Sequence, residues 1–133
     1  MYEIKTGNIL LARHIVPDDI RPGLNFFSDD AEFIQVGAWG HYEKDKELKR
    51  HIHNAFDRIS SRTCEVLYVI KGAIEVSIYS LDENLVEKRI VGQGELLVLL
   101  ECGHGYRILA EDTTVLEVKN GPYAGAEKDR YRF

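Results

Sequence analysis

Residues 64–79 read CEVLYVIKGAIEVSIY and indicate the fold class of the chain. The first half of this stretch is rich in β-branched and aromatic residues, and it ends at Gly72. In the second half, Ile74, Val76 and Ile78 occupy every other position, so they share one face of a strand. Two β-strands joined by a hairpin turn at Gly72 are therefore predicted.

The period of two continues through the second half of the chain. Further strands are predicted there over residues 85–91, 95–100, 106–109 and 113–119. Gly, Asp and Asn separate these short strands, a spacing that predicts an all-β sandwich or barrel. The first half is less regular, with strands predicted over residues 9–16 and 32–41, a loop over 17–30 and a solvent-facing charged run over 44–50.

Composition narrows the class of protein further. A chain of 133 residues with 44% hydrophobic residues supports one domain with its own core. No long apolar run and no leader-like N-terminal segment is present, so neither a membrane span nor secretion is expected. A net charge of -5 without a basic stripe argues against nucleic acid as a partner. Two cysteines form no disulfide framework, and the predicted location is the cytoplasm.

Two of the five histidines form the sequence His51-Ile-His53. On a strand, residues two apart point to the same face about 7 Å apart, so both imidazoles could bind one metal ion. Glu65 shares a strand face with Leu67 and Val69. A carboxylate that faces a protein interior is costly unless it is paired or bound to a metal. Both observations indicate a metal site.

His104 is the next candidate ligand. It lies between Gly103 and Gly105, where the backbone can turn sharply before the next strand and bring the ring toward the centre. Three imidazoles and one carboxylate suit zinc, iron, nickel or manganese. On an octahedral ion, such a set leaves two positions for water or a substrate.

At this level of detail the chain resembles the cupin superfamily. The first cupin motif is a His-x-His pair followed by a glutamate, six residues and a glycine, here His51, His53, Glu65 and Gly72. The second motif is a glycine, a hydrophobic strand, a turn and a histidine, here Gly94 and His104. Eleven residues separate His53 from Glu65, more than in the usual motif, so residues 54–64 are expected to form a loop beside the metal.

The resemblance implies a fold and a cofactor. The fold is a cupin (double-stranded β-helix or jelly-roll) barrel formed by residues 1–133 as a single domain. N-terminal strands would occupy residues 1–43, the barrel core about 44–119 and a tail 120–133. The cofactor is one divalent transition metal (Fe, Mn, Ni or Zn), and its implied ligands are His51, His53, Glu65 and His104.

Four further residues are candidates for binding a substrate. Arg58 and Arg62 lie on the inserted loop, and an arginine at a pocket mouth can bind a carboxylate or phosphate in a bidentate way. His41 is interpreted as an acid or base on a neighbouring strand, and Tyr106 as a proton donor.

The resemblance leaves three functions open. The first is a metal-dependent dioxygenase, isomerase or epimerase that acts on a small polar carbohydrate or carboxylate. The second is a module that binds a small ligand without turnover, since a fold alone does not decide function. The third is a metal-free nucleotide-sugar epimerase or ketoisomerase, with His51 or His53 as base and Tyr106 as acid. In each case a homodimer is expected, because small cupins commonly associate through N-terminal strands.

Overall fold

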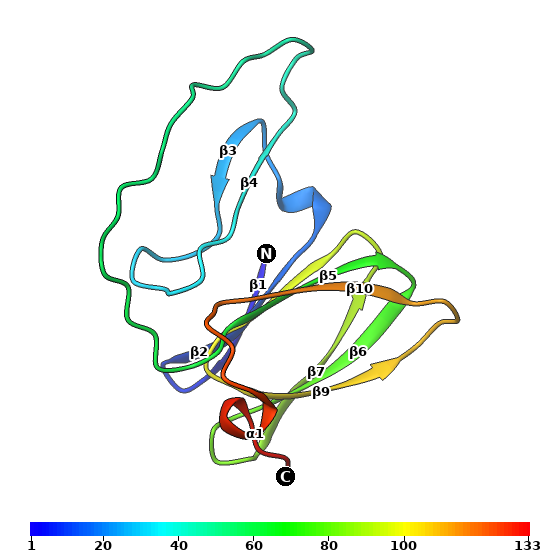
Figure 1. Ribbon diagram of the computed structural model, residues 1–133. Coiled ribbons are helices and arrows are strands. Elements are labelled where there is room, and N and C mark those ends of the chain that lie inside the picture. The colour runs from blue at the N-terminus through cyan, green and yellow to red at the C-terminus, as the bar shows by residue number, and fades with distance from the viewer.

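The computed structural model describes residues 1–133 and is built mainly of antiparallel β-structure, as predicted (Figure 1). The strands are β1 (Tyr2–Thr6), β2 (Ile9–Ile15), β3 (Gly23–Phe26), β4 (Gly37–Gly40), β5 (Glu65–Lys71), β6 (Ala73–Tyr79), β7 (Leu85–Gly92), β8 (Leu96–Leu99), β9 (Gly103–Ile108) and β10 (Thr114–Lys119). Two single turns of helix complete the chain, η1 (Pro17–Asp19) and α1 (Ala126–Asp129). None of its helices has the length and hydrophobicity needed to cross a membrane.

Two sheets enclose the main hydrophobic core (Figure 1). The larger has the order β1-β2-β8-β5-β10 and the smaller β7-β6-β9. The predicted apolar face of residues 73–79 is confirmed, because Ile74, Val76 and Ile78 are all buried. They pack in one cluster with residues of the larger sheet, among them Leu67 and Leu97. Alternation therefore assigns each of these side chains to the space between the sheets.

The turn at Gly72 differs from the sequence prediction. Strands β5 and β6 do not pair with each other, because β5 pairs with β8 and β10 while β6 pairs with β7 and β9. Gly72 therefore carries the chain from one sheet to the other and is not the tip of a hairpin. Its φ of +81° is left-handed, and a Cβ there would collide with Thr113.

In the first half of the chain, the structure has less strand than predicted over residues 32–41 and more than predicted over residues 17–30. Of the strand expected over residues 32–41, only β4 forms, and the expected loop over 17–30 contains η1 and β3. Strands β3 and β4 pair only with each other as a separate hairpin. Between them, Phe27, Ile34 and Val36 pack against the outer face of the larger sheet. Contacts of these three side chains with residues far away in the sequence determine the conformation of this segment. The local hydrophobic pattern does not reveal such contacts.

Residues 41–59, called the arm below, follow the hairpin and leave the body of the molecule (Figure 1). The arm contains no helix or strand. Its only backbone–backbone hydrogen bond runs from Lys46 N to Glu43 O, at 3.2 Å. The predicted exposure of the charged run 44–50 is confirmed.

Candidate functional site

Glu65 is the first residue of β5 and faces the space between the sheets. The register places it opposite Lys119 on β10 and Leu99 on β8. Its neighbours on the same face, Leu67 and Val69, are buried, and Glu65 is itself only 5% exposed. The predicted inward position of this carboxylate is confirmed.

Three polar side chains surround the carboxylate. Lys119 Nζ lies 2.7 Å from Glu65 Oε1. The Tyr106 hydroxyl donates a hydrogen bond of 3.0 Å to Glu65 Oε2, and His104 Nε2 lies 3.3 Å from the same oxygen. These four residues, Glu65, His104, Tyr106 and Lys119, are called the Glu65 cluster below. Strands β5, β9 and β10 each contribute to it, so both sheets build it.

The cluster holds Glu65 as a carboxylate. Burial by itself would raise the pKa of Glu65, but hydrogen bonds from His104 and Lys119 outweigh burial and lower it from 4.5 to about 2. Burial likewise opposes the charge of Lys119, yet its bonds to Glu65 and Glu117 raise its pKa. Burial, together with the negative charge of Glu65, raises the pKa of Tyr106. Near neutral pH the cluster therefore contains a carboxylate, an ammonium and a protonated phenol.

His104 retains one unused polar atom. Its Nδ1 is buried and has no hydrogen-bond partner. Its ring is stacked on that of Tyr106, with ring centroids 5.3 Å apart. Because buried polar atoms are nearly always paired, this nitrogen stands out as one able to bind a further group.

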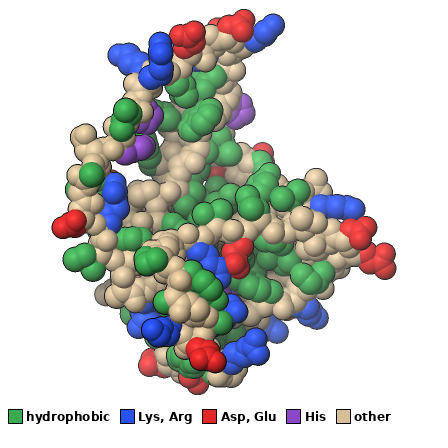
Figure 2. All heavy atoms as spheres, viewed as in Figure 1, with side chains coloured by type: hydrophobic (Ala, Val, Ile, Leu, Met, Phe, Trp, Pro, Cys, Tyr) green, Lys and Arg blue, Asp and Glu red, His purple; other side chains and the backbone are tan.

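A cavity of about 270 Å³ adjoins the cluster. Its lining is mostly apolar and comes from the inner faces of four strands: Leu67, Ile74, Tyr106, Ile108, Val115 and Glu117. The cavity lies between the edges of β9 and β10, neither of which has a second partner strand. Hydrophobic side chains gather on this face of the molecule (Figure 2). An apolar cavity with a few polar groups at one end is the usual form of a small-molecule site.

The structure does not bring the predicted histidine pair to the cluster. His51 and His53 lie on the arm, exposed and outside any strand, with ring centroids 5.0 Å apart. His51 Nδ1 lies 3.2 Å from the carbonyl oxygen of Lys49. No group of three or more histidine, cysteine, aspartate or glutamate side chains is close enough to hold a metal ion. Of the four predicted ligands, only Glu65 and His104 therefore meet.

The predicted substrate-binding residues are also dispersed. Tyr106 belongs to the Glu65 cluster. Arg58 lies on the arm with its guanidinium 3.6 Å above the ring of Phe56. His41 is exposed at the end of β4, and its Nε2 donates to the carbonyl oxygen of Ile20 at 3.1 Å.

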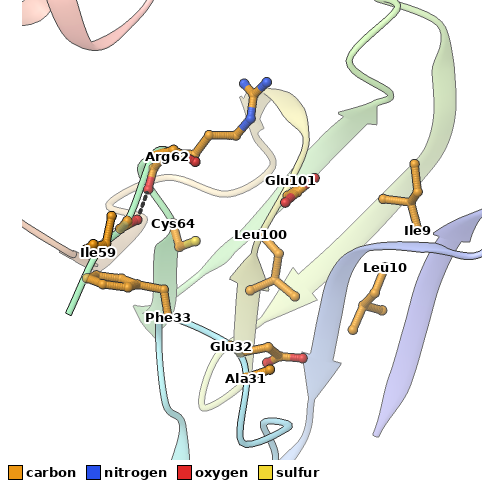
Figure 3. Close-up of a pocket in the computed structure, with 12 residues that line it drawn as sticks. Ile9, Leu10, Ala31, Glu32, Phe33, Ile59, Arg62, Cys64, Leu100 and Glu101 are labelled. Carbon is orange, nitrogen blue, oxygen red and sulfur yellow. Dashed lines mark hydrogen bonds between the residues drawn. The ribbon is translucent and has the colours of Figure 1, made fainter. Parts of the chain in front are cut away.

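Arg62 lines a second cavity, of about 380 Å³, on the outer face of the larger sheet (Figure 3). Leu10, Cys64 and Leu100 form its apolar floor, and the Arg62 guanidinium points away from them. Glu32 lines it too, but its carboxylate binds Arg13 on β2. The guanidinium of Arg62 and the carboxylate of Glu32 are therefore not available at the floor of this cavity to bind a ligand.

One member of the Glu65 cluster and one further polar cluster were not foreseen from the sequence. Lys119 is the closest partner of Glu65, but only the β5–β10 register places these residues opposite each other. His14, the one histidine to which the sequence assigned no role, is only 5% exposed. Its Nδ1 accepts a hydrogen bond from Arg89 Nε at 2.9 Å, and its Nε2 donates to Glu95 Oε2 at 2.8 Å. This cluster joins β2 to β7 and closes the side of the sandwich opposite to β9 and β10.

Comparison with protein-family models, with curated proteins and with solved structures found no match to this chain. The function is therefore inferred from the Glu65 cluster, the cavity beside it and the motifs of the sequence.

Proposed function

We propose that this protein is a divalent-metal-binding cupin enzyme, acting as a dioxygenase or as an isomerase or epimerase on a small polar carbohydrate or carboxylate. The observation that carries the proposal is the inward-facing Glu65–His104 pair, which Tyr106 connects to an adjoining apolar cavity. Two free cysteines suit the reducing cytoplasm, where we place the enzyme.

The spacing of these two donors fits a shared metal ion. Two ligands bound at about 2.1 Å are about 3.0 Å apart at an octahedral ion and about 3.4 Å apart at a tetrahedral one. Glu65 Oε2 and His104 Nε2 are 3.3 Å apart. Lys119 contacts the other oxygen, Oε1, so at Oε2 a metal would compete only with the Tyr106 hydroxyl and His104. In the proposal His51 and His53 complete the ligand set from the arm, although they are not at the pair in this conformation.

A metal at this place would act as a Lewis acid on a substrate oxygen or, if redox-active, would activate dioxygen. The chain's own residues would bind and orient the substrate. Tyr106 lines the cavity and its hydroxyl keeps its proton near neutral pH, so on substrate binding it would turn from Glu65 Oε2 and donate to a substrate oxygen. Lys119 holds Glu65 in its charged form, and the apolar lining would contact the carbon skeleton of the substrate.

A second candidate function is favoured by Lys119. Its ammonium already balances the charge of Glu65, and Tyr106 also binds the carboxylate. The cluster is thus electrically balanced without a metal. This favours a metal-free epimerase or ketoisomerase in which Tyr106 acts as the acid and a histidine of the arm as the base.

Metal analysis by inductively coupled plasma mass spectrometry distinguishes the two functions. We expect about one equivalent of iron, manganese, nickel or zinc in the parent protein and a loss of most of it in Glu65→Gln and His104→Ala. Glu117→Gln is the matched control, because it removes a more exposed carboxylate that also contacts Lys119. The metal proposal is wrong if the reconstituted parent binds no metal, or if both ligand variants retain it.

A further inference from the structure

The C-terminal tail, residues 120–133, crosses one end of the sandwich (Figure 1). It begins with Asn120, directly after β10, and ends with Phe133, whose ring rests against Gly103 at the start of β9. Strands β9 and β10 are edge strands of the two opposed sheets. The tail therefore lies across the opening between the sheets at this end.

The first residue of the tail is firmly attached and is called the root below. Asn120 Oδ1 accepts a 2.6 Å hydrogen bond from Cys64 N. Its Nδ2 donates to Ser60 Oγ at 3.2 Å and to the carbonyl oxygen of Arg62 at 3.1 Å. Three hydrogen bonds thus fix the root to the segment that precedes β5.

Beyond the root, two contacts hold the tail to the body of the protein. Asp129 of α1 accepts a 2.6 Å hydrogen bond from Thr63 Oγ1. Phe133 packs edge-to-face on Tyr79, with ring centroids 5.3 Å apart, and a Cβ added at Gly103 would lie 3.0 Å from the Phe133 ring. Helix α1 has no buried residue, and Phe133 is 61% exposed. A segment with so few buried contacts opens locally at a small cost in free energy.

These attachments adjoin the Glu65 cluster. The root directly follows Lys119. Gly103, on which the latch-like Phe133 ring rests, directly precedes His104. Glu65 itself lies two positions after Thr63. Movement of the tail beyond its root would therefore uncover the end of the sandwich at which the cluster lies.

We propose that the tail is a strap that opens about its root and controls the access of solutes to the Glu65 cluster, with the Phe133 ring as its latch. Gly121 and Gly125 lie between the root and α1, and glycine tolerates the backbone changes that a hinge requires. No tail residue lines the cavity beside the cluster, so the strap closes a second entrance. This inference goes beyond the proposed function, because it concerns access and applies to a metal-dependent and a metal-free enzyme alike.

The thiol of Cys102 reports the opening of the strap. Cys102 directly precedes Gly103 and packs against the main core. Burial and the nearby negative charge of Glu65 raise its pKa to about 12, so it should react slowly while the strap is closed. Cys64 is the internal control, since it is buried and lines the cavity on the outer face of the larger sheet. Alkylation of both thiols by iodoacetamide is followed by mass spectrometry of peptides.

Loosening either contact should speed the alkylation of Cys102. We expect a rate increase of about fivefold for Phe133→Ala, from the loss of the aromatic contact, and of about fivefold for Thr63→Val, from the loss of the hydrogen bond. The double variant should reach about 25-fold, because two separate contacts hold one moving segment. Tyr123→Ala is the matched control, since Tyr123 is an aromatic residue of the tail that is 69% exposed and forms neither contact.

Gly103→Ala tests the latch from the other side. The added Cβ would displace the Phe133 ring without changing any residue of the tail, so Cys102 should react about as fast as in Phe133→Ala. In the Phe133→Ala background the same Cβ meets only Tyr79, at 3.4 Å, and should have no further effect. A further acceleration in that background would overturn the role of Phe133 as the latch.

The other results separate a moving strap from general loosening. Parent-like alkylation of Cys102 in Phe133→Ala overturns the proposal. The same result in Thr63→Val also overturns it, because the ring would then be a local cover and the tail would not move as one segment. Equal acceleration at Cys102 and Cys64 in Phe133→Ala indicates unfolding of the whole domain and excludes the strap. None of these rates depends on whether the parent binds metal, so the strap and the proposed function fail separately.

Discussion

Acid should weaken the fold through Glu65, and the size of the effect follows from its surroundings. The pKa of this carboxyl group is about 2 in the folded protein, compared with 4.5 for a glutamate that makes no interactions. A group whose folded pKa is lowered stabilises the fold above its unfolded pKa, and this stabilisation is lost as the pH falls toward the folded value. The shift corresponds to about 3 kcal/mol, of which about 2 kcal/mol is lost by pH 3.

The assay is denaturant unfolding followed by far-ultraviolet circular dichroism at several pH values from 6.5 to 3, with a chelator present so that no metal contributes. The parent and Glu65→Gln are compared, because other carboxylates titrate in both proteins. We expect the free-energy advantage of the parent over the variant to shrink by about 2 kcal/mol across this range. Glu117→Gln is the control, and it should follow the parent, since Glu117 is much more exposed than Glu65.

Parallel pH profiles for the parent and Glu65→Gln would refute the reasoning. They would mean that the ion pair with Lys119 and the bonds from His104 and Tyr106 do not favour the charged form over the neutral one. Direct titration of Glu65 by nuclear magnetic resonance gives an independent check, because it should still be ionised at pH 3.

Two further predictions concern the scaffold. Arg13→Met should lower the free energy of unfolding by about 3 kcal/mol, because Arg13 is 3% exposed and its loss leaves the nearly buried Glu32 without a partner. The control variant Lys5→Met removes an exposed ion pair and should change the free energy of unfolding by less than about 0.5 kcal/mol. Equal losses for the two variants in chemical denaturation would contradict this prediction. Gly72→Ala should lower the free energy of unfolding by more than about 1 kcal/mol in the same assay, since it adds a clash with Thr113 to an unfavourable φ. At Gly7, φ is also positive but the space around a Cβ is open, so an equal loss for Gly7→Ala would argue against the clash.

Part of the candidate site was predictable because it depends on local pattern. Alternation placed Glu65 on the inner face of its strand, and the structure confirms it. The sequence also singled out His104 and Tyr106, which both reach Glu65. Lys119 could not be predicted as their partner, because 53 residues separate it from Glu65 and only the β5–β10 register brings the two together.

The sequence by itself determined that this chain forms short β-strands, where most of those strands lie and which of their faces are apolar. Those properties depend on side chains one or two positions apart. Only the tertiary structure decided that Gly72 joins two sheets, that His14 is buried and that the arm carrying His51 and His53 stands away from the Glu65 cluster. Strand partners and sheet edges depend on packing between residues far apart in the chain. The same local pattern is compatible with several such arrangements.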